Sequence, residues 1–171
     1  MPNATVIALD TNVLIDLAAN DETVLDCLST ISKKFKKAPI IVPPTVIGEL
    51  ADIAKNGDDE ESRHLALLAL KSIRDPWRFQ PINYVPVGHG IIEETARKIR
   101  SAGLIPNEEI NDSFVIAEAA LANTTILISS DSDLKDIDQG ALRKILEECS
   151  VGDLIIFSPH KIVKLFYNSV H

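Results

Sequence analysis

The sequence predicts an α/β fold, with a mainly parallel sheet of roughly five strands between two layers of helices. Short apolar segments rich in β-branched residues alternate with longer segments whose apolar residues recur at helical spacing. The short segments are apolar throughout, which is typical of strands covered on both faces. Proline, glycine and asparagine residues separate the two kinds of segment. This pattern favours a three-layer, Rossmann-like domain.

Five segments have the pattern of a buried strand, and each is followed by a predicted helix. The strands are expected at residues 5–9, 40–42, 82–87, 124–129 and 154–157. The helical stripes are expected at residues 24–31, 46–53, 65–73, 92–99, 114–121 and 142–146. Because strands and helices alternate, neighbouring strands are expected to run parallel.

Turn residues mark the boundaries of these segments. Pro43-Pro44 separates the second strand from a helix that Thr45 is expected to help cap, and Asn56-Gly57 ends that helix. Asp75-Pro76 stops the next helix, and Ser158-Pro159 begins a helix after the last strand. The punctuation therefore agrees with the hydrophobic pattern.

The composition predicts one globular domain covering residues 1–171, since a chain of this length buries a sizeable core. The net charge of −8 argues against a protein that coats nucleic acid through bulk charge. No apolar run approaches the roughly 18 residues of a membrane span. The N-terminus lacks a basic segment followed by a long apolar one, so a cytoplasmic location without membrane contact is expected.

Neither the cysteines nor the histidines have the spacing of a zinc site. Cys27 and Cys149 lie far apart and form no C-x-x-C pair, so both are expected to be small buried residues. The four histidines are scattered, at His64, His89, His160 and His171. Zinc and a disulfide framework are therefore not expected.

Four acidic residues occupy positions where a parallel sheet gathers ligand-binding side chains. Asp10 directly follows the first strand, and Asp131 follows the fourth. Glu49 lies early in the helix after the second strand, and Asp112 lies near the start of a later helix. Ligands of doubly wound sheets bind beyond the carboxyl ends of the strands. These four side chains are therefore expected to meet.

Each acid also has a structural interpretation as a helix cap, a turn residue or a partner of a helix dipole. Together, however, they would repel one another. Two unit charges 4 Å apart repel by about 1 kcal/mol in water and by about 4 kcal/mol near a protein surface. A hard cation such as Mg²⁺ or Mn²⁺, which prefers carboxylate oxygens, would offset this repulsion.

At these residues the sequence resembles the PIN domain family of metal-dependent ribonucleases, which occur in toxin–antitoxin systems and in RNA processing. The resemblance spans nearly the whole chain and follows five motifs in order. They are ALDTNVLIDL (8–17), IVPPTVIGEL (41–50), NDSFVIAEAALAN (111–123), ILISSDSDL (126–134) and IIFSPHKIVKLF (155–166). Leu134 departs from the family pattern, because an aromatic residue is usual at its position.

The resemblance implies a site and a reaction. Asp10, Glu49, Asp112 and Asp131 would be the catalytic and metal-binding residues, with Mg²⁺ or Mn²⁺ as the cofactor. Possible residues of a supporting shell are Thr11, Asn12, Ser129 and Asp133, of which Asp133 has an alternative as a turn residue. The reaction would be hydrolysis of an RNA phosphodiester to a 5′-phosphate and a 3′-hydroxyl. The implied partners are RNA and, for a toxin, an antitoxin protein.

Two other functions remain open. The chain could be a PIN-like binding module without catalysis. It could also be a metal-dependent phosphatase of the haloacid-dehalogenase type, although such enzymes need a second aspartate where this chain has Asn12. No Ser–His–Asp or Cys–His pairing suggests a covalent nucleophile.

Three further features each have a structural and a functional interpretation. The basic runs at 33–37 and 97–100 are solvated helix segments or contacts for phosphate. Trp77 is a packed anchor or a platform for base stacking. The apolar helices near 24–31 and 65–73 could supply a homodimer face, although core packing predicts the same stripes.

Overall fold

A computed structural model describes residues 4–84 and 86–169 of the chain. Its centre is a five-stranded sheet in the order β3-β2-β1-β4-β5, and every neighbouring pair is parallel. The strands are β1 (Ile7–Leu9), β2 (Ile40–Val42), β3 (Gln80–Pro81), β4 (Ile126–Ile128) and β5 (Ile155–Phe157). The predicted α/β class and the parallel sheet are confirmed.

The middle of the sheet is fully enclosed. All three residues of β1 have no exposed surface, and β1 pairs with β2 on one side and β4 on the other. Ala8 lies opposite Ile41 and Leu127 in these two pairings. Burial on both faces explains why the central strands are apolar throughout instead of alternating in polarity.

The third predicted strand is wrong in position. The structure places β3 at Gln80–Pro81, and helix α5 begins at Pro86, inside the segment 82–87 that was expected to be extended. Residue 85 lies outside the described residues. A proline suits the first turn of a helix because it has no N–H to leave unpaired, and Pro81 is tolerated in β3 because that strand is at the sheet edge.

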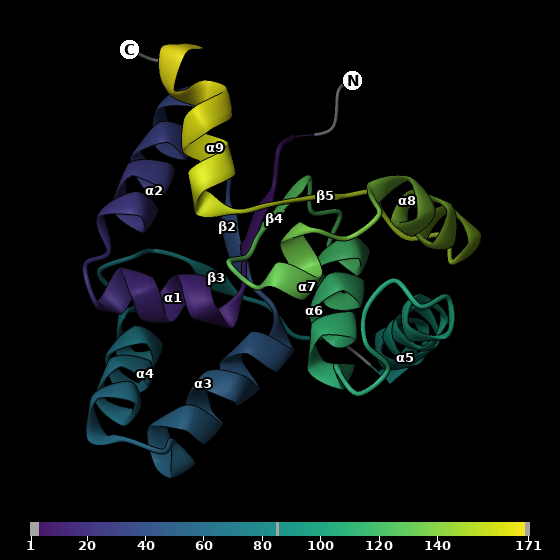
Figure 1. Cartoon of the computed structure of the whole chain (residues 1–171), viewed down its shortest axis with the longest axis horizontal. Helices are drawn as coiled ribbons and strands as arrows, with labels where there is room; N and C mark the ends of the chain where they lie inside the picture. The colour runs from purple at the N-terminus through teal and green to yellow at the C-terminus, as the bar shows by residue number, and fades with distance from the viewer. Residues whose placement is uncertain (1–3, 85, 170–171) are drawn as a thin grey trace.

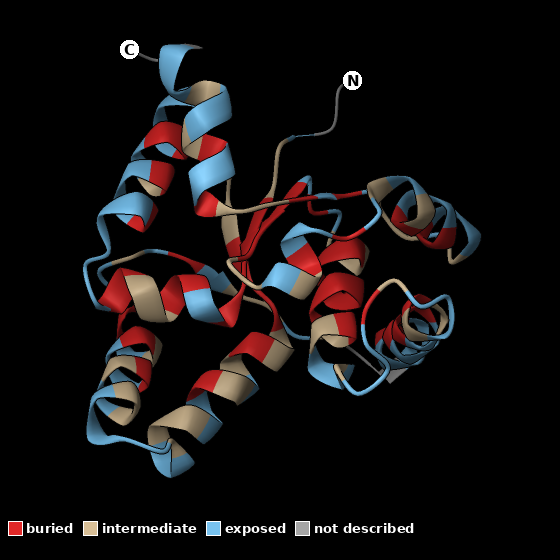
Figure 2. Ribbon diagram, in the orientation of Figure 1, coloured by how far each residue is buried: buried red, intermediate tan, exposed pale blue. Residues whose placement is uncertain are grey.

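Helices cover both faces of this sheet. In Figure 1, α1, α2, α4 and α9 lie on one side of the strands, and α5, α6 and α8 lie on the other. The helices are α1 (Thr11–Ala18), α2 (Glu22–Lys34), α3 (Pro44–Asn56), α4 (Glu60–Ser72), α5 (Pro86–Ser101), α6 (Ile110–Leu121), α7 (Ser132–Lys135), α8 (Gln139–Glu148) and α9 (Pro159–Phe166), followed by the 3₁₀ turn η1 (Tyr167–Ser169). Figure 2 shows the buried residues concentrated on the strands and on the helix faces turned toward them.

Side-chain caps fix where several helices begin. Asp21, Asp59, Asp138 and Ser158 each accept a hydrogen bond from a backbone N–H in the first turn of the helix that follows. Each cap satisfies a donor that the helix itself leaves unpaired. The predicted start of α9 after Ser158 is therefore confirmed.

Helix α3 begins differently from what the sequence predicts. Pro43 occupies its cap position without a side-chain hydrogen bond, and Pro44 is its first residue. Thr45 does not cap its own helix but donates to a carboxylate of α6. The helix ends as predicted, at Asn56 before Gly57.

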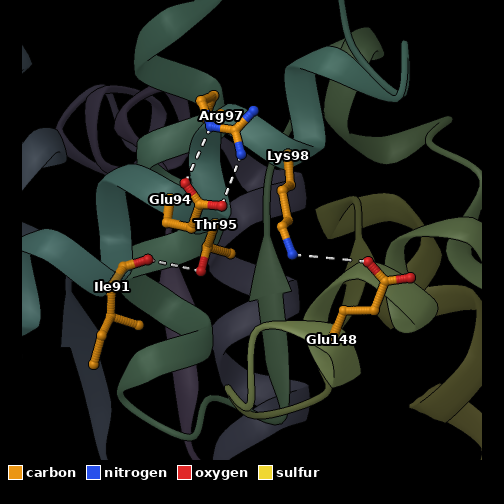
Figure 3. Close-up of polar contacts among 6 residues, drawn as sticks. All are labelled: Ile91, Glu94, Thr95, Arg97, Lys98 and Glu148. Atoms are coloured by element: carbon orange, nitrogen blue, oxygen red, sulfur yellow. Dashed lines mark hydrogen bonds and ion pairs between the residues drawn. The ribbon is translucent and has the colours of Figure 1, made fainter.

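The basic run at 97–100 makes contacts within the protein. Figure 3 shows Arg97 paired with Glu94 on α5, and Lys98 reaching Glu148 of α8. Beside them, the Thr95 hydroxyl donates to the Ile91 carbonyl one turn earlier. Arg100 donates to the Ser113 hydroxyl at 2.6 Å, which ties α5 to the start of α6. These contacts support the structural interpretation of the run.

Phe35, in the other basic run, and Trp77 are both packed against other aromatic residues. The Phe35 and Phe166 rings meet edge to face, with their centroids 5.4 Å apart, and the Lys34 ammonium lies 5.9 Å from the Phe166 ring centre. Trp77 packs against Phe79 and the hydrophobic core. These contacts favour anchoring over base stacking for Phe35 and Trp77.

Within the described residues, no helix combines the length and apolar character needed to cross a bilayer.

Candidate metal centre

Asp10 stands at the point where β1 ends and α1 begins. Its backbone N–H donates to the carbonyl of Ile128 on β4, which holds it against the neighbouring strand. Its Oδ1 accepts a 2.8 Å bond from the Thr11 N–H, and its Oδ2 accepts a 2.6 Å bond from the Ser129 hydroxyl. Burial and the charge of Asp131 raise its pKa, while these two bonds act in the opposite direction. Asp10 therefore caps α1 and also faces the acidic centre.

Ser129 connects Asp10 to Asp131. While its hydroxyl donates to Asp10, its oxygen accepts a 3.1 Å bond from the Asp131 N–H. Asp131 in turn caps the short helix α7 by accepting a 2.8 Å bond from the Asp133 N–H. The ends of β1 and β4 are thereby joined through one buried hydroxyl group. The structural and functional interpretations of Asp10 and Asp131 are compatible, since a cap uses only part of a carboxylate's capacity as an acceptor.

Glu49 enters the centre from α3. Its Oε1 accepts a 3.1 Å bond from the Thr11 hydroxyl, so Thr11 contacts both Asp10 and Glu49. Burial, followed by the negative charge of Asp10, raises the pKa of Glu49 to about 7. Glu49 also lines an open cavity of about 440 Å³ together with Asp52 and Asn111. Glu49 is the member of the predicted quartet of acids that lines this cavity.

Asp112 enters from the first turn of α6 and is half-buried. Its Oδ2 is buried and has no hydrogen-bond partner among the described residues. Burial, followed by the charges of Asp131 and Asp10, raises its pKa to about 7. A buried carboxylate oxygen without a donor is unfavourable, so this atom points to a missing partner.

The structure brings two of the four predicted acids into one close group with Asp133 and places the other two within electrostatic reach of it. Ligand oxygens of Asp112, Asp131 and Asp133 lie within 4.8 Å of one another. Asp10 and Glu49 are not part of this closest group, but the charges of both raise the pKa of Asp112. Asp133, expected as a supporting residue, therefore belongs to the closest group, and its role as ligand or turn residue stays a prediction.

The donor set fits a hard divalent cation. All the converging groups are carboxylates, which suit Mg²⁺ or Mn²⁺, and no described cysteine or histidine lies in the cluster. A cation would provide the partner that Asp112 Oδ2 lacks and would reduce the repulsion that raises the neighbouring pKa values. The metal-binding roles of the individual residues remain proposals.

Two of the predicted supporting residues differ in burial. Ser129 is fully buried and bonded to Asp10, as described above. Asn12 is exposed on α1, so a role in steadying the first loop stays a prediction. Leu134, which replaces the usual aromatic residue, is fully buried in the core, so the departure concerns packing.

Glu118 is a residue that the sequence analysis missed. It lies on α6, is only 5% exposed, and its two oxygens accept bonds from the N–H and hydroxyl of Thr45. Its charge is among the causes that raise the pKa of Glu49. The sequence does contain a signal for this residue, because Glu118 is a charged residue in the middle of an apolar helical segment, AEAAL (117–121).

A parallel sheet with carboxylates gathered beyond its carboxyl ends defines an α/β protein with an acidic centre. The sequence profile of the family described as PIN domain matches residues 7–140. The chain therefore belongs to the PIN domain family. Among curated protein sequences, no significant match was found.

Several solved structures share this fold. A chain of VapBC2 from Rickettsia felis, solved bound to a DNA fragment from its promoter, is 17% identical with a TM-score of 0.60, and the match covers 90% of this chain and 98% of that one. VapBC-1 from nontypeable Haemophilus influenzae is 16% identical with a TM-score of 0.59, and the match covers 92% of this chain and 100% of that one. FitAcB from Neisseria gonorrhoeae is 16% identical with a TM-score of 0.54, and the match covers 90% of this chain and 97% of that one. At these identities the likeness establishes the fold.

Proposed function

We propose that the protein is a Mg²⁺- or Mn²⁺-dependent ribonuclease that hydrolyses RNA phosphodiester bonds. One observation carries the proposal: carboxylates from four separate segments converge, and Asp112 Oδ2 is buried there without a partner. Membership of the PIN domain family supports the same chemistry. When bound, a divalent ion lowers the pKa of an attacking water and stabilises the charge that develops on phosphate oxygens.

The chain's own residues would place and hold that ion. Asp10, Glu49, Asp112 and Asp131 would serve as its ligands, with Asp133 close enough to assist. Ser129 and Thr11 would orient the carboxylates of Asp10 and Glu49 through the bonds described above. The open cavity beside Glu49 would admit the RNA phosphate.

RNA cleavage by the purified protein tests the proposal. Cleavage should require Mg²⁺ or Mn²⁺, stop with a chelator, and be lost in Asp10→Asn and Asp112→Asn variants that still fold. Asp26→Asn, at an exposed position on α2, is the matched control and should retain activity. Equal cleavage by wild type and both site variants would contradict the assignment of this site.

The alternatives predict different results. A binding module would bind RNA or protein without cleaving it, and Asp10→Asn would leave its cellular role intact. A phosphatase would hydrolyse a small aryl phosphate, but Asn12 occupies the position where that chemistry needs a second aspartate. The absence of aryl phosphate hydrolysis beside metal-dependent RNA cleavage would separate the two enzyme classes.

For the cellular role, we propose a toxin that pairs with an antitoxin protein. The solved structures similar to this chain include VapBC and FitAB structures, and the PIN family includes toxins of such pairs. Expression of the wild-type chain should arrest growth, while the Asp10→Asn variant should not. Unchanged growth with an active nuclease would favour the RNA-processing role. We further propose that residues 1–171 form one domain and that the protein is cytoplasmic. We also propose a homodimer, which light scattering would test.

A further inference from the structure

Glu118 is a buried carboxylate that the proposed reaction does not use. It lies on α6, and both of its oxygens are occupied by one residue of α3. Oε1 accepts a 2.9 Å bond from the Thr45 N–H, and Oε2 accepts a 2.8 Å bond from the Thr45 hydroxyl. This two-point contact joins residues 73 positions apart in the sequence.

Helix α3 lacks a cap of its own, which explains what the contact supplies. The cap position is Pro43, whose side chain makes no hydrogen bond, and Pro44 has no N–H. The N–H of Thr45 is therefore the first donor that the start of this helix presents. A carboxylate at a helix N-terminus satisfies that donor and interacts favourably with the helix dipole. Glu118 thus caps α3 from another helix.

The positions of Thr45 and Glu118 relate this contact to the metal centre. Glu49 follows Thr45 by one helical turn on α3, roughly 6 Å along the axis. Asp112 precedes Glu118 on α6 by about 9 Å along the axis. Since each helix is a stiff element, a contact that locks Thr45 to Glu118 also fixes the separation of Glu49 and Asp112.

A cap alone does not require a buried carboxylate. Most of the helix caps that the described residues show come from an exposed or half-exposed aspartate or serine next to the helix in sequence. Burying Glu118 instead carries a desolvation penalty, and its charge adds to the repulsion acting on Glu49. The two-point contact between α6 and α3 is therefore the feature that a buried residue at this place provides and an exposed cap would not.

We propose that Glu118 is a positioning residue of the metal centre, which holds Glu49 and Asp112 at the separation that one ion requires by capping α3 from α6. This inference rests on the proposed function. Glu118 is not itself assigned as a ligand, because both of its oxygens are bonded to Thr45 and it is absent from the closest carboxylate group.

Two substitutions at Glu118 separate geometry from charge. Glu118→Ala removes the contact, and we expect Mn²⁺ binding to weaken by about 10- to 100-fold, as for other residues that orient metal ligands. The kcat for RNA should fall by a similar factor, with KM changed by less than about twofold, because the substrate contacts remain. Glu118→Gln keeps an acceptor for the Thr45 N–H and offers an amide donor to its hydroxyl, so it should restore most of both quantities.

Thr45 provides the same test from the other side. Thr45→Ser retains the hydroxyl and should behave like wild type. Thr45→Val removes it and should show part of the Glu118→Ala defect, with less than additive effects in the double variant. If Glu118→Gln were as defective as Glu118→Ala, the charge and not the contact would matter, and the proposal would be overturned.

A stability control guards against a merely structural explanation. Ile162→Ala, at a fully buried position on α9, which packs against α2, should destabilise the fold without changing Mn²⁺ affinity or kcat at temperatures where it is folded. If Glu118→Ala behaved in the same way, the positioning role would be wrong. Mn²⁺ titration by calorimetry distinguishes a failure of the proposed function from a failure of the positioning role. A wild type that binds Mn²⁺ but cleaves no RNA would refute the proposed function. The Mn²⁺ affinities of the Glu118 variants would still test positioning.

Discussion

Ser129 donates a 2.6 Å hydrogen bond to Oδ2 of Asp10, although the two residues are 119 positions apart. The same hydroxyl oxygen accepts the N–H of Asp131. Two acids that follow neighbouring parallel strands are therefore held in a fixed relation by one side chain. Because the contact is fully enclosed, water cannot replace it without a rearrangement.

Replacing Ser129 with alanine should disturb both acids. The Asp10 oxygen and the Asp131 N–H would each lose a partner, and leaving a buried polar group unsatisfied costs about 1–3 kcal/mol. We expect Ser129→Ala to lower the free energy of unfolding by roughly that amount and to weaken Mn²⁺ binding. Denaturant unfolding and calorimetry measure the two effects. Ser101→Ala, at an exposed position, should change neither.

Asp112→Asn should have opposite effects on the stability of the metal-free protein and on metal binding. The substitution removes a charge that lies against Asp131 and Asp10. Metal-free protein should therefore be stabilised by about 1 kcal/mol, which corresponds to about 2–4 °C in the melting temperature for a chain of this size. Mn²⁺ should stabilise wild type but no longer this variant.

The exposed Asp26→Asn variant is the control for Asp112→Asn, since it removes the same charge far from the cluster. It should leave the melting temperature nearly unchanged and the Mn²⁺ response intact. A lower melting temperature for metal-free Asp112→Asn would mean that the carboxylate is satisfied in the apo protein, contrary to its unpartnered Oδ2.

Stability of the metal-free protein should fall as pH rises. The pKa values of Glu49 and Asp112 are raised from 4.5 and 3.8 to about 7, in both cases mainly by burial. Between these ordinary values and about 7, the folded state therefore binds more protons than the unfolded state, and the free energy of unfolding decreases with pH. Thermal unfolding with a chelator at about pH 5 and about pH 8 measures this decrease.

Added Mn²⁺ should reverse that loss mainly at the higher pH. The cation binds the ionised carboxylates, so its affinity should rise with pH through the folded pKa values near 7. Glu49→Gln, which removes one of the two titrating groups, should flatten the pH dependence. A metal-free stability that is constant between the two pH values would contradict the raised pKa values of Glu49 and Asp112.

The sequence predicts the fold well because the strands and helices alternate and each strand is apolar throughout. The approach of the four acids to one another could be expected because a parallel sheet brings the ends of distant strands to one edge, and their role as metal ligands stays a prediction. The position of the third strand could not be predicted, because the segment 82–87 has strand propensity, whereas the structure places the strand at Gln80–Pro81 and begins helix α5 at Pro86. The partnership of Glu118 with Thr45 is also invisible in sequence, because it depends on how α3 crosses α6.

The two thiols should report on opening of the protein around the core. Burial raises the pKa of Cys27 to about 12, whereas Cys149 is half-buried. Because the thiolate is the reactive form, an aromatic disulfide reagent should label Cys149 in the folded protein and Cys27 only when the chain unfolds. In a Cys149→Ser variant, Mn²⁺ should slow labelling of Cys27, because a ligand that binds only the folded state reduces the unfolded population. Rapid labelling of Cys27 with Mn²⁺ present would show instead that α2 opens independently of the metal centre.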